Sequence, residues 1–444
     1  MPSPTQTPLL GTDKPPSAWA YWPFFVLGVL NNASYVLMLA SATEIASSGI
    51  AMVYLVVNLP GLVVKASAPY FFEQVSYRAR AVGCGAAMAT AFVLVGAAKV
   101  IFGHSLVGTL AQFVGVALVS VQCALGEASL LALSARGFVG GPGVRNPRLN
   151  MWSSGTGLAG IVGDAWLIVF HTWMGLSFET TLLLALGLAV VYLYVFFKVI
   201  AVPPPVLGDG AVGFDAVGAF DGEALGVSEV DDGDAPKRLA PEADAADVAS
   251  TNTGMTARQR AAFTWSLWPY VVPLILIYFA EYSMQGGAWA AIGFPVTSQE
   301  KRSTFYLYAN WSYQFGVVIS RSSGFYYSPG LKTLWAMPVG QCCLLAFFVA
   351  DAMPQFMWWY SYSLLPLCGV AGLFGGCVYV NAFRLCSDAL PQPLKELGAA
   401  SLAVSMDIGC TFANVAGLFI QSCLYQANGI PGASATCPFG RRRR

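Results

Sequence analysis

The stretch "MWSSGTGLAGIVGDAWLIVFHTWMG", residues 151–175, places a run of small residues inside an apolar segment that is long enough to cross a bilayer. A transmembrane helix requires roughly 20 mostly apolar residues, and the one carboxylate here is Asp164. Gly155, Gly157 and Gly160 formally match the G-x-G-x-x-G fingerprint of dinucleotide binding. That fingerprint requires a preceding strand and a soluble βαβ unit, so a membrane segment excludes a dinucleotide site.

As a helix, this segment carries a face of small and polar residues. At about 100 degrees per residue, Ser153, Gly157, Gly160 and Asp164 fall on the same side. Small residues at this spacing allow membrane helices to approach closely. Two interpretations remain open: the face packs tightly against another helix, or it also borders a polar cavity.

The composition extends this interpretation to the whole chain. Of the 444 residues, 56% are hydrophobic and 10% are charged, and the mean hydropathy is +0.60, whereas soluble domains are about 25% charged. Segments of about ten alternating residues, typical of a transmembrane barrel, are absent. The sequence predicts an all-α polytopic membrane protein with about eleven spans: 19–40, 49–72, 81–102, 105–134, 151–175, 178–202, 264–286, 303–324, 331–351, 356–386 and 396–426.

One long polar segment divides the chain. Residues 203–262 hold eleven of the 23 acidic residues and few large apolar groups, so we expect a disordered cytoplasmic linker. Two helical bundles joined in this way are typical of secondary transporters. The predicted organisation is a cytoplasmic tail (1–18), a six-helix bundle (19–202), the linker, a five-helix bundle (263–427) and a C-terminal tail (428–444).

Lysine and arginine predict the orientation, because cytoplasmic loops hold them in excess. With the amino terminus in the cytoplasm, 16 of the 23 basic residues fall on the cytoplasmic side. The four arginines of 441–444 break the pattern, since an odd number of spans puts them on the other side. On that same side, Cys423 and Cys437 are candidates for a disulfide in an oxidising lumen.

Five blocks of sequence resemble the battenin family of lysosomal and vacuolar membrane proteins. They are "FFVLGVLNNASYVLMLASA" (24–42), "GEASLLALSARG" (126–137), "WSSGTGLAG" (152–160), "LIYFAEYSMQGG" (276–287) and "VYVNAFR" (378–384). The resemblance implies a fold similar to equilibrative nucleoside transporters and the major facilitator superfamily, with eleven helices arranged six plus five. It also implies a part in glycerophosphodiester export, basic amino acid handling or control of vacuolar pH.

Polar residues recur on single faces of several spans, which points to a hydrated path between the bundles. Charged groups inside a membrane usually face a cavity or a partner. The predicted substrate-binding residues, which include members of the family blocks, are Asn31, Tyr35, Lys65, Glu127, Ser153, Asp164, Glu281, Asn310, Gln314, Arg321, Asn381, Arg384, Asp407 and Asn414.

Each charge in this set has a functional and a structural interpretation. Lys65, Arg321 and Arg384 are candidates for holding a phosphate or carboxylate, since hydrogen bonds between ions are strong. Arg321 and Arg384 also suit anchors near helix ends. The carboxylates of Glu127 and Asp407 either pair structurally with these cations or take part in coupling. Charge balance or proton transfer is the role expected for the four carboxylates together: Glu127, Asp164, Glu281 and Asp407.

The sequence holds no motif for a hydrolase, a metalloprotease or an ATPase, and we expect neither an enzyme nor a cofactor or metal site. The predicted function is a secondary transporter or facilitator of a small charged metabolite in the lysosomal or vacuolar membrane. The expected partners are membrane lipids, the small-molecule substrate and protons, with no nucleic acid. The alternative is a non-transporting scaffold that regulates vacuolar pH or trafficking, with cytoplasmic trafficking partners on the linker.

Overall fold

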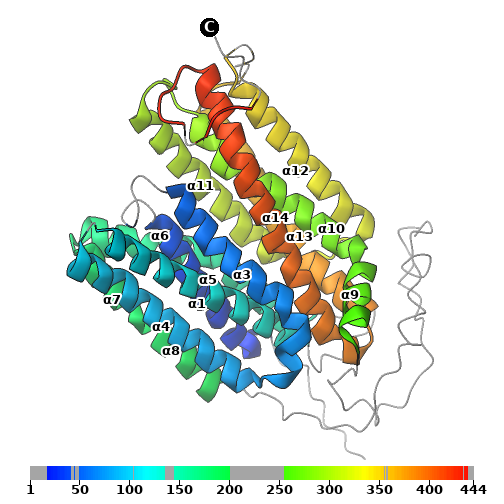
Figure 1. Ribbon diagram of the computed structural model, residues 1–444. Coiled ribbons are helices and arrows are strands. Elements are labelled where there is room, and N and C mark those ends of the chain that lie inside the picture. The colour runs from blue at the N-terminus through cyan, green and yellow to red at the C-terminus, as the bar shows by residue number, and fades with distance from the viewer. Residues whose placement is uncertain are drawn as a thin grey trace, which may run out of the picture.

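The computed structural model describes residues 18–41, 45, 50–103, 105–135, 145–200, 255–354, 356, 359–433 and 435–438. Within these ranges the secondary structure is entirely helical (Figure 1). The predicted linker, 203–262, lies outside the described residues up to residue 254, as do residues 1–17 and 439–444. An all-helical membrane fold is therefore confirmed.

The first half of the chain folds as one bundle of long helices. Its elements are η1 (Ala18–Tyr21), α1 (Trp22–Ala40), α3 (Ile50–Phe71), η2 (Phe72–Gln74), α4 (Tyr77–Phe102), α5 (Leu106–Ala135), α6 (Pro147–Leu167), η3 (Ile168–Trp173), α7 (Phe178–Leu184) and α8 (Leu186–Lys198). α1 packs mainly on α6, and α4 packs on α5.

The second half forms a second bundle. Its elements are α9 (Ala257–Ser266), α10 (Trp268–Ser283), η5 (Met284–Ala288), η6 (Trp289–Ala291), α11 (Gln299–Arg321), η7 (Ser323–Phe325), α12 (Leu331–Asp351), η8 (Tyr362–Leu364), α13 (Leu365–Ala389) and α14 (Gln392–Ala427). α11 packs on α13, and α10 packs on α14.

Polar caps fix where several helices begin. The Ser76 side chain accepts a hydrogen bond from the backbone of Ala79 at the start of α4, and Asn146 does the same for α6, where Pro147 follows as the first helical residue. Thr256 and Gln259 form a reciprocal capping box at the start of α9. These caps satisfy backbone donors that would otherwise be exposed at the membrane boundary.

Among the described residues, eight helices are long and apolar enough to span a membrane, and α9 with α10 forms one further candidate bent by 72°. α3 has a shorter apolar stretch and α11 is too polar to qualify, although both run beside spanning helices (Figure 1). Eleven spans are therefore compatible with the structure. Exposed Trp19 and Trp265 lie near one end of the bundle and Trp173 near the other, as in the aromatic belts of membrane proteins.

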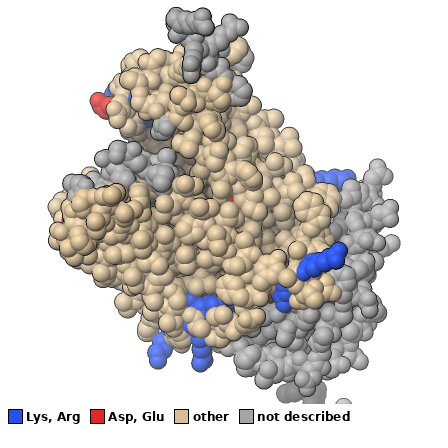
Figure 2. Space-filling model, in the orientation of Figure 1, with Lys and Arg blue, Asp and Glu red and all other residues tan. Residues whose placement is uncertain are grey.

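The two halves meet along two seams. In the first, α14 packs on α3 and α5; in the second, α6 packs on α11 and α13. We call the end of the molecule where α8 ends and α9 begins the linker end, and the opposite end, where α14 ends, the far end. Figure 2 shows Lys and Arg gathered towards the linker end of the face in view.

At the far end, a disulfide joins Cys423 of α14 to Cys437, as the sequence suggested. The other eight cysteines are free, and most are buried among the helices. The segment after α14 is thus tied back to its own helix.

Candidate functional site

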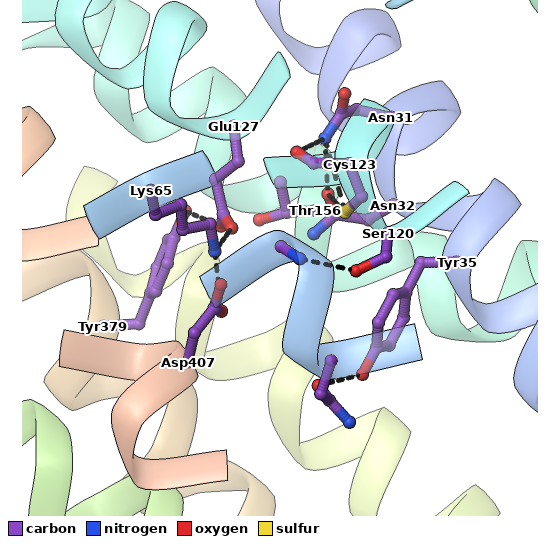
Figure 3. Close-up of polar contacts among 12 residues, drawn as sticks. Asn31, Asn32, Tyr35, Lys65, Ser120, Cys123, Glu127, Thr156, Tyr379 and Asp407 are labelled. Atoms are coloured by element: carbon purple, nitrogen blue, oxygen red, sulfur yellow. Dashed lines mark hydrogen bonds and ion pairs between the residues drawn. The ribbon is translucent and has the colours of Figure 1, made fainter. Parts of the chain in front are cut away.

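At the centre of the first seam, one lysine lies between two carboxylates. Lys65 of α3 places its Nζ 2.6 Å from Oε2 of Glu127 in α5 and 2.8 Å from Oδ1 of Asp407 in α14 (Figure 3). Glu127 belongs to the same half as Lys65, whereas Asp407 belongs to the other half. We call these three residues the Lys65 cluster, and it forms an ion pair across the boundary between the halves.

Neighbouring polar groups hold the Lys65 cluster in position. The backbone N–H of Gly61, one helical turn before Lys65, donates to Ser120 Oγ of α5 at 2.8 Å and fixes α3 against α5. On the other side, the Tyr379 hydroxyl of α13 donates to Glu127 Oε1 at 3.1 Å. Tyr379 in turn accepts a hydrogen bond from Trp152 Nε1 of α6 at 3.0 Å. Side chains of α3 and α13 therefore contact Glu127 directly, and α6 is connected to it through Tyr379.

Lys65 and Glu127 are buried, Asp407 is half-buried, and the three side chains together carry an excess negative charge. Lys65 is 3% exposed and Glu127 is 6% exposed. One ammonium facing two carboxylates leaves one negative charge uncompensated within the cluster when both acids are ionised. Because the positive charge of Lys65 is already shared between two carboxylates, it is poorly placed to attract a further anion.

A second cation, half-buried Arg321, lies in the other seam. Its guanidinium donates to Thr156 Oγ1 of α6 at 2.7 Å and to the Tyr278 hydroxyl of α10 at 3.1 Å. Its Cζ lies 4.1 Å from the centre of the Tyr379 ring, an arrangement typical of cation–π contacts. Among the described residues no carboxylate lies within 4.0 Å of this guanidinium, and its buried Nε has no hydrogen-bond partner.

Glu281 of α10 is a buried carboxylate of a different kind. It is 2% exposed and accepts a hydrogen bond from the Tyr313 hydroxyl of α11. Its second oxygen, Oε2, has no hydrogen-bond partner in the described part of the chain. Glu281 Oε2 occupies the space that a Cβ on Gly375 of α13 would fill, so the absence of a side chain at Gly375 leaves room for the carboxylate.

The small residues of α6 allow the close helix contacts that the sequence suggested. A Cβ at Gly28 would lie 2.6 Å from the carbonyl oxygen of Trp152, and one at Gly155 would overlap the carbonyl of Phe25, so α1 and α6 touch backbone to backbone. On its other side α6 faces α11, where Gly157 lies against Arg321 and Gly160 against Gln314. Residues 152–160 of α6 therefore pack against helices of both halves.

Hydrogen bonds between the halves continue from the Lys65 cluster to the linker end. Tyr77 donates to Glu396 at 2.9 Å, and Asn150 donates to the carbonyl of Gly324 at 2.9 Å. Arg145 donates to the carbonyls of Phe325 and Tyr326. These contacts add to the hydrogen bonds between the halves at Asp407, Arg321 and Tyr379. The halves are thus joined at the linker end as well as at the Lys65 cluster.

Two predicted site residues of α1 make their side-chain hydrogen bonds within the first half. Asn31 donates to the carbonyl of Cys123 at 3.1 Å and accepts from Gln122 at 2.9 Å. Tyr35 donates to Asn58 of α3 at 2.9 Å. The hydrogen bonds of these two side chains hold α1 against α3 and α5.

The remaining predicted residues are scattered. Asn310 donates to Tyr306 within α11, and Asn381 donates to Cys377 within α13. Arg384 donates to the carbonyl of Pro329 at 2.6 Å and pairs with Asp388 at 3.5 Å, near the linker end. Three others lack a hydrogen-bond partner in the described ranges: half-buried Asp164, the buried Oγ of Ser153 and the buried Nδ2 of Asn414.

Several residues of this centre were not predicted. Tyr379, Tyr278, Trp152 and Thr156 connect the charged groups, yet each looks like an ordinary residue of an apolar span. All four lie within the quoted family blocks, which is the one signal in the sequence that singles them out. Among the described residues there is no group of three or more His, Cys, Asp or Glu side chains suited to a metal ion.

Comparison with known proteins gives a consistent family match. The family model described as "CLN3 protein" matches residues 22–427. Battenin of Canis lupus familiaris is 30% identical over 438 residues, which cover 90% of this chain and 90% of that protein. Protein BTN1 of Yarrowia lipolytica is 29% identical over 423 residues, covering 93% of this chain and 97% of the relative.

Solved structures show the same fold at low sequence identity. A variant of the E. coli fucose:proton symporter FucP has a TM-score of 0.54 and 11% identity, covering 93% of this chain and 97% of its own. FucP in the outward conformation, described as a major facilitator superfamily transporter, has a TM-score of 0.50, 12% identity and coverage of 92% and 98%. The chain is therefore a multi-pass membrane protein whose fold is similar to that of these two structures.

Proposed function

Because this chain belongs to the CLN3 protein family, we propose that it is a secondary transporter of a small anionic metabolite in the lysosomal or vacuolar membrane. The two bundles alternate between an arrangement joined at the linker end and one joined at the far end. The substrate class we propose first is the glycerophosphodiesters, whose phosphate carries one negative charge.

Arg321 carries this proposal. It is a half-buried cation at the boundary between the halves, with no carboxylate within 4.0 Å among the described residues. A guanidinium presents several N–H donors in a fixed fork that suits phosphate oxygens. The other two candidate cations already have carboxylate partners: Lys65 has Glu127 and Asp407, and Arg384 has Asp388.

The Lys65 cluster has a different role in this proposal. The Lys65–Asp407 ion pair joins the halves. It must therefore break, or one of its members must change partner, when the two bundles move relative to each other. An anion arriving at Arg321 lies against Tyr379, which also donates to Glu127. Tyr379 is therefore the direct physical connection between the proposed anion site and the ion pair between the halves.

We propose that the linker end faces the cytoplasm and the far end the lumen. Basic residues gather at the linker end, as positive-inside orientation requires (Figure 2). The Cys423–Cys437 disulfide lies at the far end, and structural disulfides persist in oxidising compartments and are rare in the cytosol. The two observations agree on the orientation.

A proteoliposome assay tests the transport proposal. Vesicles holding the purified full chain are given a labelled glycerophosphodiester, and labelled lysine serves as a second probe for the basic amino acids. Arg321→Gln removes charged hydrogen bonds of about 1.5–3 kcal/mol each, so uptake of the phosphodiester should fall by about 10-fold or more. Arg258→Gln, at an exposed arginine near the linker end, is the matched control and should transport normally.

The same assay separates a carrier from a scaffold. Deleting residues 210–255 leaves both bundles tethered, so a carrier should retain uptake, whereas a scaffold acting through this segment should lose its cellular effect. Uptake equal to that of empty vesicles for both probes would refute transport. Uptake of lysine but not of the phosphodiester would assign the substrate to the basic amino acids.

A further inference from the structure

The four carboxylates predicted from the sequence to balance charge or transfer protons differ in their surroundings. Glu127 and Asp407 share the ammonium of Lys65, with oxygen to nitrogen distances of 2.6 and 2.8 Å. Asp164 is half-buried and retains access to its surroundings.

Glu281 is the exception among them. It is 2% exposed, one oxygen receives only a phenol O–H, and the other oxygen has no donor in the described part of the chain. No Lys or Arg nitrogen among the described residues lies within 4.0 Å of it. A buried carboxylate without a cation is costly, and such groups are commonly neutralised by binding a proton.

We propose that Glu281 is the proton-binding residue of the transport cycle and that one proton bound there accompanies each singly charged anion bound at Arg321. This inference rests on the proposed transport function and deepens it. It also assigns the Lys65 cluster a fixed charge that does not change during the cycle.

The groups around Glu281 come from several helices. α11 contributes Tyr313, which donates to the carboxyl, and Arg321, whose charge acts on it from beyond ion-pair distance. α14 contributes Cys410. α10 itself contributes Tyr278 and Tyr282.

The other helices packed on α10 bring no charge close to Glu281 in the described structure. α13 presents the backbone of Gly375, while its Arg384 and Asp388 pair near the linker end. The charged residues of α12, Lys332 and Asp351, lie at its two ends, and η5 has none. The basic residues of α9 lie in its first turn at the linker end. Arg321 is therefore the charge that matters most for protonation of Glu281.

Geometry connects the proton site to the anion site. Tyr278 and Glu281 lie one turn apart on α10, and their partners Arg321 and Tyr313 both lie on α11. The Tyr313–Glu281 and Arg321–Tyr278 hydrogen bonds therefore both join α11 to α10, at successive turns of α10. An anion that draws Arg321 away from Tyr278 changes the α10–α11 contact that also holds Glu281.

Charge balance gives the ratio of protons to anions. In the empty protein two cations, Lys65 and Arg321, face three carboxylates at the centre. Binding one anion adds a negative charge in a region where an unbalanced charge is costly, and one proton on Glu281 cancels it. The loaded and empty centres then carry the same net charge, so transport of a singly charged anion should be electroneutral.

Proteoliposomes with glycerophosphoglycerol, a singly charged glycerophosphodiester, provide the test. Two modes are measured: exchange of label at equal pH on both sides, and accumulation driven by a pH gradient. Glu281→Gln mimics the protonated acid, so exchange should stay within about twofold of wild type while gradient-driven accumulation is lost. Glu300→Gln, an exposed carboxylate at the far end of α11, is the matched control and should behave as wild type.

The outcomes distinguish the two proposals. Absence of exchange in the wild type refutes the proposed function itself. Wild-type exchange together with gradient-driven accumulation by Glu281→Gln equal to wild type overturns only the proton site. Faster uptake when a membrane potential is imposed on the wild type overturns the one-to-one ratio.

A second variant covers the case in which Glu281→Gln does not fold. Tyr313→Phe removes the phenol donor that stabilises the ionised carboxyl, so Glu281 should keep its proton to higher pH. The midpoint of the pH profile of uptake should therefore move to higher pH. An unmoved midpoint, in a variant that still exchanges label, would overturn the assignment.

Discussion

Lys65 and Asp407 are 342 residues apart in the sequence, and their Nζ and Oδ1 atoms lie 2.8 Å apart across the boundary between the two bundles. Because Glu127 binds the same ammonium at 2.6 Å, Lys65 connects a carboxylate of its own half to one of the other half. A contact of this kind stabilises the protein and also stands in the way of any movement between the bundles.

Removing the shared cation should destabilise the protein strongly. Lys65→Met leaves two buried carboxylates facing each other, and breaking a buried pair in this way costs about 3–5 kcal/mol. Thermal unfolding in detergent, followed by tryptophan fluorescence, should show a lower midpoint. The triple variant Lys65→Met, Glu127→Gln, Asp407→Asn removes all three charges and should recover much of the loss. If the triple variant has an unfolding midpoint no higher than that of Lys65→Met, uncompensated charge is not the cause of the lost stability.

Loss of the carboxylate in the other half should favour opening at the linker end. Cys386 is buried there, in a pocket lined by Leu131 and Asn146 of one half and Lys395 of the other. Asp407→Asn weakens a charged contact worth about 1.5–3 kcal/mol, so Cys386 should react with a maleimide about 10-fold faster or more. Mass spectrometry of the Cys386 peptide measures the rate.

The control for this experiment is Glu300→Gln, which changes an exposed carboxylate at the far end and should leave the labelling rate unchanged. Equal rates in wild type and Asp407→Asn would mean that the Lys65–Asp407 contact does not hold the linker end closed.

The backbone contact between α1 and α6 should not tolerate a single methyl group. Gly155→Ala places a Cβ where the carbonyl of Phe25 lies, and such overpacking costs about 1–3 kcal/mol. Gly83→Ala is the matched change, since a Cβ there meets only Leu125 of α5, at 3.6 Å, which is an ordinary van der Waals distance. Thermal unfolding should separate the two variants, and equal midpoints would contradict the close approach of α1 and α6.

The disulfide at the far end should protect two thiols from alkylation. Differential alkylation with mass spectrometry should find Cys423 and Cys437 unmodified until a reductant is added, and Cys437→Ser should make Cys423 reactive. In sealed, oriented vesicles an impermeant reductant should act from the far-end side alone. Alkylation of both thiols without reductant would remove this support for the proposed orientation.

Much of the fold was predictable because it depends on local properties of the chain. The length and apolarity of the spans require helices in lipid, where every backbone polar group must be satisfied internally. The small residues of 152–160 predicted close helix packing, and Gly28 and Gly155 confirm it. The pairing of Cys423 with Cys437 followed from two cysteines on the side expected to be oxidising.

The site was less predictable, because helical spacing gives the direction of a side chain but not its neighbour. Asn31 and Lys65 were both expected to face the path between the bundles on the same evidence. Asn31 instead binds Cys123 and Gln122 inside the first half, whereas Lys65 lies at the boundary. No periodicity distinguishes the two cases, since each helix of a bundle has neighbours on several sides.

The sequence by itself determined that this chain is a polytopic helical membrane protein and which charged groups the membrane must accommodate, because lipid imposes these requirements on each segment separately. Only the tertiary structure decided that Lys65 has two carboxylate partners, that Arg321 has none among the described residues, and that Glu281 has a phenol and no cation. These differences arise from contacts between helices far apart in the chain. They depend on how the two bundles pack, which no single segment encodes.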